Sequence, residues 1–277
     1  MSELSLRGMT TVLLAHGAGG GIEANYAGLI EDLSADHTVI GVDLPGTGSA
    51  PRRSVPLTLD GLADELVAAA EGHDRFAIVG YSLGTAIAIR AATRHPDRVS
   101  GLVLTAPFAR PNPRMTMLVE LWRELLSGDP EQLAAFVHLV GIGTPTLDRL
   151  GADELAGSLS ATVVPPGTPD HLDLIDVVDV RADLARIAVR TLVISTTQDN
   201  LVTPHHHREV ADGVHQAEYV ELASGHLPFV EAPQRWIGLV RGFLDDQDRA
   251  TPSDSADAAT AVATAGATRG SNGDGMM

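Results

Sequence analysis

The sequence contains no cysteine, and all 19 of its basic residues are arginine. The absence of cysteine excludes a disulfide framework, a thiolate nucleophile and a cysteine-based zinc site. The 36 acidic residues give the chain a formal net charge of −17 at pH 7. A nucleic-acid binder needs a basic face to displace counterions from phosphates, and an anionic membrane surface repels an acidic chain. We therefore expect neither nucleic acid nor membrane among its partners.

Long apolar runs are missing as well. Residues 1–10 contain no basic stretch followed by an apolar run, so they lack the pattern of a secretory signal. No uninterrupted apolar stretch approaches the roughly 20 residues that span a bilayer. The sequence therefore predicts a soluble, cytoplasmic protein, and its 277 residues are enough for one α/β domain.

Short apolar runs, by contrast, recur along the chain. They are hydrophobic throughout rather than at alternate positions, which is typical of strands buried on both faces of a parallel sheet. They lie at residues 10–15, 37–43, 75–80, 99–105, 190–196 and 217–222. Helical patterns separate them at 23–34, 58–71, 83–94, 205–213 and 231–245. This alternation predicts an α/β fold with a mostly parallel sheet and helices on both faces.

Residues 108–172 interrupt the alternation. The segment opens on the proline-rich stretch FARPNPRM and contains helical patterns at 115–127, 130–140 and 152–160. We interpret it as a helical lid; a long surface excursion is the alternative, although structureless loops of this length are uncommon. The predicted organisation is a core at 1–107, the lid at 108–172, the rest of the core at 173–247 and a disordered Ala/Thr/Ser/Gly-rich tail at 248–277.

Residues 80–84 read Gly-Tyr-Ser-Leu-Gly and fit the pattern G-x-S-x-G. A predicted strand ends at Gly80 and a predicted helix of small residues follows at once, which is the context of a nucleophile elbow. In such a turn Ser82 takes a strained backbone conformation, and the flanking glycines relieve the clashes. A serine that only caps the helix is the alternative interpretation.

Two polar residues follow later strands of the predicted sheet. Asp199 comes after the run 190–196, and His226 comes after the run 217–222. Because the carboxyl ends of parallel strands meet at one edge, both side chains can converge there on Ser82. Asp173 or Asp176 are remote substitutes for the carboxylate.

Together these features resemble the α/β-hydrolase fold superfamily, in which the nucleophile, acid and histidine occur in this chain order. The matching segments are HGAGG (16–20), DLPGTGSAP (43–51), GYSLG (80–84), the Asp199 loop and GHLPFVEAP (225–233). The resemblance implies an α/β-hydrolase fold with the lid inserted after the sixth core strand of the family. It also implies a serine hydrolase that uses neither a cofactor nor a metal.

The resemblance assigns roles by position. It implies that Ser82 is the nucleophile, that His226 is the general base and acid, and that Asp199 orients the imidazole. It places the backbone N–H groups of Ala18 and Leu83 in the oxyanion hole. These roles are chemically consistent, because a serine hydroxyl is a weak nucleophile until a base takes its proton.

Two departures from the family pattern concern the N-terminal part of the chain. Only a short segment precedes His16, the residue that shapes the oxyanion loop in this family. The leading antiparallel strands would therefore be truncated to about residues 4–7. The three consecutive glycines at 19–21 also make the oxyanion loop pliable.

Substrate selection has a weaker signature in the sequence. Tyr81, Phe108, Met115 and Trp122 are candidate lining residues of an apolar acyl pocket, and packing of the lid onto the core is the alternative for this set. The run of histidines at 205–207 suggests a metal, but consecutive helical residues face three directions. We interpret it as a solvated helix start, and the remaining histidines as surface residues.

Three functions are compatible with these residues. The leading hypothesis is a cofactor-free serine hydrolase that cleaves a small or medium apolar ester or thioester through a Ser82 acyl-enzyme. The second uses the same triad for C–C cleavage, elimination or cyclisation, since fold does not determine reaction. The third is a ligand receptor that keeps a hydrolase-like pocket. The expected partner is a small-molecule substrate for the two enzyme hypotheses; the receptor would instead bind a ligand without turnover.

Overall fold

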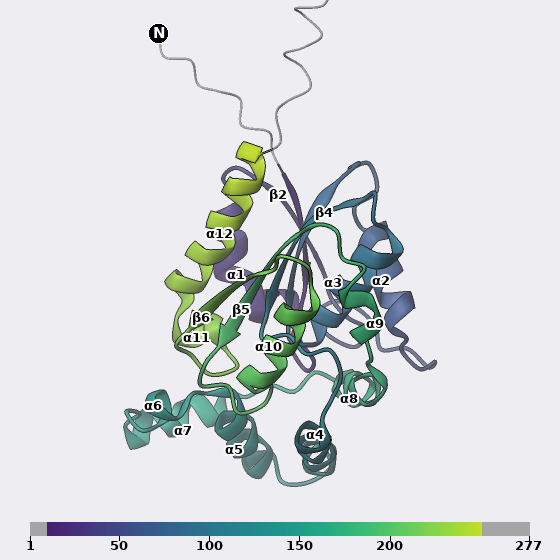
Figure 1. Cartoon of the computed structure of the whole chain (residues 1–277). Helices are drawn as coiled ribbons and strands as arrows, with labels where there is room; N and C mark the ends of the chain where they lie inside the picture. The colour runs from purple at the N-terminus through teal and green to yellow at the C-terminus, as the bar shows by residue number, and fades with distance from the viewer. Residues whose placement is uncertain (1–9, 251–277) are drawn as a thin grey trace, which may run out of the picture.

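The computed structural model describes residues 10–250 of the chain. In this part of the chain the centre is a six-stranded sheet in which neighbouring strands are all parallel (Figure 1). The strand order is β2-β1-β3-β4-β5-β6. The strands are β1 (Thr11–Ala15), β2 (Thr38–Val42), β3 (Phe76–Tyr81), β4 (Val99–Thr105), β5 (Arg190–Thr196) and β6 (Glu218–Leu222). The predicted parallel sheet is confirmed.

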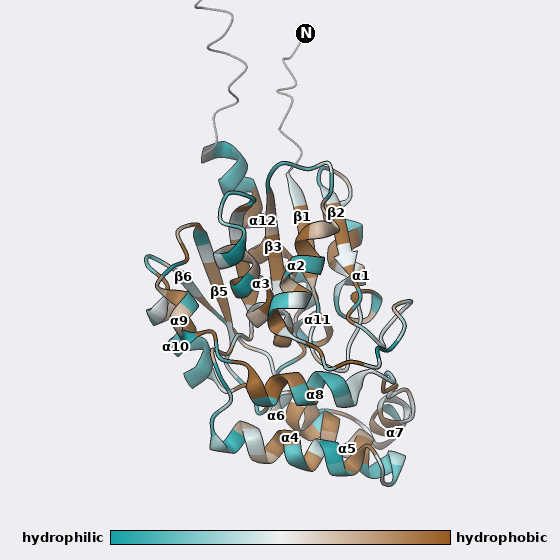
Figure 2. Cartoon of the chain, turned by 90° about the vertical axis from the view of Figure 1, so that its right-hand side faces the viewer, coloured by the Kyte–Doolittle hydropathy of each residue, from teal (hydrophilic) through white to brown (hydrophobic). Residues whose placement is uncertain are grey.

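Helices cover both faces of the sheet, as predicted. In β1, Val12 and Leu14 belong to the core that α1 and α12 complete, whereas Leu13 belongs to the core beneath α2, α3 and α10. Successive strand residues face opposite sides, so a strand that is apolar at every position needs a helical layer on each face. Figure 2 shows the hydrophobic strands, in brown, between helices that carry both hydrophobic (brown) and hydrophilic (teal) residues. The bounds are α1 (Ile22–Leu33), α2 (Leu59–Ala68), α3 (Leu83–Arg94), α9 (Arg181–Leu184), α10 (Pro204–Gly213), α11 (Pro228–Glu231) and α12 (Pro233–Ala250).

A helical insertion follows β4 and lies beneath the carboxyl ends of the strands (Figure 1). We call its members the cap helices: α4 (Pro113–Leu125), α5 (Pro130–Gly141), α6 (Thr144–Leu147), α7 (Ala152–Ser160) and α8 (Thr168–Val177). The three predicted helical patterns of the insertion correspond to α4, α5 and α7. The predicted end of the insertion at residue 172 falls inside α8, so the insertion is longer than predicted. Pro169 lies in the first turn of α8, where a proline forfeits no helical hydrogen bond and so does not break the helix.

Most of the predicted features at the two ends of the chain fall outside residues 10–250. The predicted strand at 4–7 lies outside the described residues, and so does most of the predicted tail. Residues 248–250, predicted as the start of the tail, instead form the last turn of α12. None of the described helices is long and apolar enough to cross a membrane.

Candidate active site

The candidate nucleophile Ser82 lies in the sharp turn between β3 and α3. Its backbone has φ of 52° and ψ of −120°, a conformation that strains a residue with a side chain. A Cβ atom at Gly80 would come within 2.7 Å of the Gly84 carbonyl oxygen, and one at Gly84 would overlap the carbonyl of Ala15. The two glycines of the motif are therefore what lets the strand and the helix close around Ser82.

The three predicted polar residues converge at the carboxyl edge of the sheet. Ser82 Oγ lies 3.0 Å from His226 Nε2, and His226 Nδ1 lies 2.6 Å from Asp199 Oδ2. All three side chains are buried. Because a carboxylate only accepts hydrogen bonds, Nδ1 of His226 carries the proton and Nε2 can accept one from Ser82. This arrangement can activate the hydroxyl as a nucleophile.

The carboxylate of Asp199 is itself held in place. Its Oδ1 accepts the N–H groups of Leu201 at 2.9 Å and Val202 at 2.8 Å, and its Oδ2 accepts the hydroxyl of Thr196 at 2.9 Å. A buried carboxylate with this many donors keeps one orientation, which in turn orients the imidazole of His226.

The structure does not support Ser82 as a simple helix cap, nor Asp173 or Asp176 as the carboxylate next to His226. Ser82 is the N-cap residue of α3, but its side chain makes no capping hydrogen bond. Asp173 and Asp176 both pair with Arg123 within the cap, at 3.3 Å and 2.6 Å. Neither carboxylate is therefore available to His226.

One backbone N–H group of the predicted oxyanion loop, residues 16–20, has no hydrogen-bond acceptor among the described residues. In the described part of the chain, three of the four N–H groups in 17–20 donate to acceptors: Asn25 Oδ1 at 3.3 Å, His171 Nδ1 at 3.2 Å and a carbonyl within the loop at 3.3 Å. The N–H of Ala18 has no such acceptor there. The N–H of Leu83 opens α3 and has no helical acceptor either. Both groups are free to bind an anion near Ser82.

His16 shapes this loop. Its Nε2 accepts the N–H of Leu44 at 2.8 Å, and its Nδ1 donates to the carbonyl of Gly17 at 2.7 Å. Burial lowers the pKa of His16 to about 4, so the ring is neutral near pH 7 and Nε2 keeps its acceptor role.

A cavity of about 210 Å³ opens at Ser82 and His226 and extends under the cap helices. Its lining residues include no Asp, Glu or Arg. Aliphatic and aromatic side chains dominate the lining: Met115, Val119, Trp122, Phe136, Val137, Val140, Val163, Val164, Ile175, Leu201, Val202, Leu227 and Phe229. The cavity can therefore accept a small uncharged group next to the serine hydroxyl.

The predicted pocket residues divide into two groups. Tyr81, Met115 and Trp122 line the cavity. Phe108 is not among its lining residues and is fully buried in the core, two residues after Ala106, whose backbone has φ of 51°. Sequence reasoning missed the contribution of α5. The apolar spacing of this helix was visible, but no local pattern tells which side of it faces a cavity.

The histidines at 205–207 differ from the prediction in how far they are exposed to solvent. His205 is exposed, but His206 and His207 are buried, so a solvated helix start is wrong for these two. His207 Nδ1 lies 3.0 Å from Ser195 Oγ on β5, and burial lowers the pKa of His207 to about 4. His37 and His171, also expected at the surface, are buried as well. Among the described residues, no group of three or more histidine, aspartate or glutamate side chains is placed so that it could hold a metal ion.

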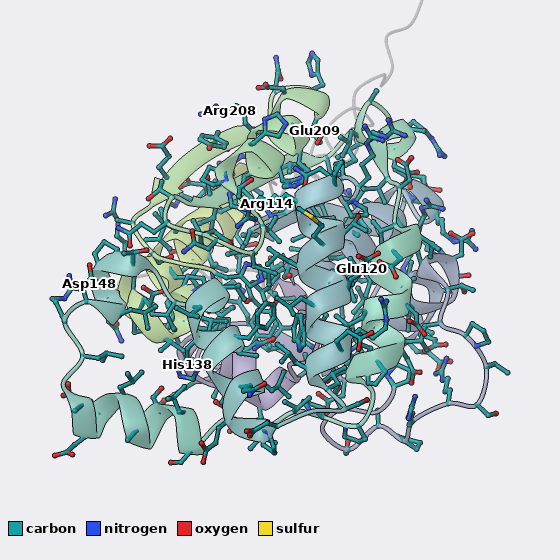
Figure 3. All side chains as sticks on the ribbon, turned by 90° about the horizontal axis from the view of Figure 1, so that it is seen from below. Arg114, Glu120, His138, Asp148, Arg208 and Glu209 are labelled. Atoms are coloured by element: carbon teal, nitrogen blue, oxygen red, sulfur yellow. The ribbon has the colours of Figure 1, made fainter. Side chains whose placement is uncertain are left out.

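The cap is attached to the same loops that carry the candidate site. Figure 3 views the cap from below, with Arg114 and Glu120 along α4. Arg114 donates to the carbonyl oxygens of Asn200 and Leu201, next to Asp199. Glu231, in the segment that follows His226, binds the cap near α6. Its carboxylate accepts the N–H of Gly143 and, at 2.7 Å, the hydroxyl of Thr146.

Comparisons with known proteins identify the family of the fold. A family model described as alpha/beta hydrolase fold matches residues 10–144. The chain is 32% identical over 243 residues to pyrrolizixenacetamide deacetylase from Xenorhabdus hominickii, with coverage of 86% of this chain and 91% of that protein. It is 32% identical over 249 residues to a pimeloyl-[acyl-carrier protein] methyl ester esterase from Chromobacterium violaceum, with coverage of 85% and 94%.

Solved structures show the same architecture. The crystal structure of the enol-lactonase from Burkholderia xenovorans LB400 superposes with a TM-score of 0.75 at 25% identity, covering 86% of this chain and 92% of that one. Sequence and structure comparisons therefore agree on the fold. The chain belongs to the alpha/beta hydrolase fold family and is an enzyme of that family.

Proposed function

We propose that this enzyme is a cofactor-free serine hydrolase that cleaves a small apolar ester or thioester through a Ser82 acyl-enzyme. The observation that carries the proposal is the hydrogen-bonded series Ser82, His226 and Asp199, which ends in an apolar cavity. Similarity to named esterases supports the carboxylic-ester hydrolase class.

The geometry supports the following reaction. Ser82 Oγ attacks the ester carbonyl carbon while His226 Nε2 takes its proton, and the carbonyl oxygen becomes an oxyanion. The N–H groups of Ala18 and Leu83 bind that oxyanion, and removal of one such donor typically costs about 3–4 kcal/mol of transition-state stabilisation. The tetrahedral intermediate then expels the alcohol or thiol, which receives the proton from His226, and leaves an acyl-enzyme.

Deacylation repeats the steps with water. His226 takes a proton from the water as its oxygen attacks the acyl carbon, and the second tetrahedral intermediate forms in the same oxyanion hole. Its collapse releases the carboxylic acid and returns the proton to Ser82. Asp199 stabilises the imidazolium during both halves of the reaction without taking its proton.

The cavity supports a small acyl group. Its volume of about 210 Å³ lies below the roughly 300–1,000 Å³ usual for drug-sized ligands. One similar protein is named a deacetylase, and an acetyl group fits within a cavity of this volume. Helices α4, α5 and α8 of the cap provide eight of the 23 lining residues of the cavity. We propose that the insertion acts as a lid domain that excludes water and selects the substrate.

Hydrolysis of p-nitrophenyl esters of graded acyl length tests this proposal. We expect turnover that is highest with short acyl chains and that falls at least about 10³-fold in Ser82→Ala. Ser160→Ala, on the exposed surface of α7, is the matched control and should retain wild-type activity. Full activity of Ser82→Ala on every ester that the wild type cleaves would refute the mechanism. Products lacking the added water would point instead to elimination or cyclisation.

A further inference from the structure

One residue of the cap contacts the oxyanion loop directly. His171 on α8 is fully buried, and its Nδ1 accepts the N–H of Gly19 at 3.2 Å. Its Nε2 lies 3.1 Å from the carbonyl oxygen of Pro45. Because a carbonyl only accepts, Nε2 carries the proton and Nδ1 is left as the acceptor for Gly19. The ring therefore connects the cap to two loops of the core.

The oxyanion loop depends on such outside contacts because its own chain is pliable. Glycines occupy positions 19–21, and Gly19 has φ of 66°, a region that glycine enters without strain. The N–H of Gly17 is held by Asn25 of α1, and the N–H of Gly19 is held by His171. The N–H of Ala18 belongs to the peptide group between these two anchored ones. Its direction follows from both anchors and from the Gly17 carbonyl of the same peptide group, which accepts from His16 Nδ1 at 2.7 Å.

We propose that His171 is a positioning residue of the catalytic site, which holds the oxyanion loop so that the N–H of Ala18 faces the oxyanion formed at Ser82. This inference rests on the proposed function. It assigns to the cap a part in transition-state stabilisation in addition to its part in shaping the cavity.

Two further observations support this role. Burial lowers the pKa of His171, so the neutral ring, whose Nδ1 can accept, is the form present near neutral pH. The first turn of α8 is also anchored independently of the ring. Arg52 binds the carboxylate of Asp170 with two hydrogen bonds of 2.7 Å and 2.9 Å, and Gly167 N–H donates to the carbonyl of Gly46 at 2.9 Å. Changing the imidazole therefore removes a specific hydrogen bond while the cap stays attached.

A pair of amide substitutions separates the two ends of the ring. In His171→Asn the amide oxygen can occupy the position of Nδ1 and accept from Gly19. In His171→Gln the longer side chain can place its NH₂ group near the position of Nε2, keeping the bond to Pro45 but leaving Gly19 without an acceptor. Asp170→Asn is the control that weakens the attachment of α8 without touching the oxyanion loop.

We expect the kcat of His171→Gln on the best p-nitrophenyl ester to fall about 10–100-fold with KM within about twofold, since one misplaced oxyanion donor acts on the transition state. His171→Asn should recover kcat to within about threefold of wild type, and Asp170→Asn should match wild type. Wild-type kcat in His171→Gln would overturn the inference. Equal losses in both amide variants with a raised KM would also overturn it, because they would indicate general disruption of the cap.

A measurement on the wild-type enzyme keeps the inference testable if His171→Gln does not fold. In the adduct with phenylboronic acid, ¹⁵N NMR should show a coupling across the hydrogen bond between Gly19 and His171 Nδ1. Absence of that coupling in the tetrahedral adduct would overturn the inference. Failure of the proposed function is recognised separately, because it would appear as activity that does not depend on Ser82.

Discussion

The buried, neutral histidines make the folded enzyme sensitive to acid, and His207 offers the sharpest test. Its side chain is fully buried, and its Nε2 has no hydrogen-bond partner among residues 10–250 and lies 3.9 Å from Asp199 Oδ2. Burial lowers its pKa from 6.5 to about 4. Between these two pH values the unfolded chain binds a proton at this position that the folded chain does not. Stability therefore falls as the pH falls below about 6.5, and the loss is complete near pH 4.

The size of the effect follows from the two pKa values. Lowering the pH from 7 to 5 should cost about 2 kcal/mol of unfolding free energy through His207 alone. His16, whose pKa is also lowered to about 4 by burial, should contribute a similar amount. Replacing His207 by methionine, an apolar residue without a titrating group, removes one of the two contributions. His205→Met, at an exposed position of the same helix, is the matched control.

Urea unfolding at pH 7 and at pH 5, followed by circular dichroism, measures the difference. Wild type and His205→Met should lose the same free energy between the two pH values. His207→Met should lose about 2 kcal/mol less, whatever its stability at pH 7. A loss in His207→Met equal to that of wild type would refute the reasoning, because it would mean that His207 titrates alike in the folded and unfolded chains.

Three further predictions concern the packing around the site. Ser82→Gly should be about 1 kcal/mol more stable than Ser82→Ala in urea unfolding, with both inactive, because glycine adopts φ of 52° without strain; equal stabilities would contradict stored strain at the turn. Gly84→Ala should prevent folding, because its Cβ would overlap a backbone carbonyl of β1, and the result should be a loss of soluble protein. Gly238→Ala is the control: it has open space around it in α12 and should gain about 0.5–1 kcal/mol of unfolding free energy. Trp236→Phe should lose about 1–3 kcal/mol by the same assay, because the indole N–H donates to Thr105 Oγ1 at 3.0 Å in a buried site; an unchanged midpoint would exclude a net contribution from that bond.

Much of the fold and of the candidate site could be read from local patterns. Continuous apolar runs predicted the six parallel strands, and the spacing of Gly80, Ser82 and Gly84 predicted the sharp turn. Asp199 and His226 followed from their positions after strands that a parallel sheet brings to one edge. In each case the chemistry is encoded within a few residues or in the rule that parallel strands end together.

Other features depended on which distant elements pack together. His206 and His207 look solvated in a polar helix start, but α10 packs against β5 and buries them. Phe108 is of a type that often lines an apolar pocket, yet it is buried in the core and is not among the lining residues of the cavity. The predicted end of the insertion at residue 172 falls inside α8, whose length depends on its packing and not on a local break in the sequence.

The sequence by itself determined the class of fold, the turn at Ser82 and the residues that can form a Ser-His-Asp arrangement, because these are set by local hydrophobic period and local backbone sterics. The tertiary structure alone decided how large the cavity is, which faces of α4 and α5 line it, and that His171 of the cap reaches the oxyanion loop. The hydrogen bond between Gly19 and His171 joins residues 152 positions apart. Their formation depends on the packing of whole helices against the sheet edge, which no short stretch of sequence encodes.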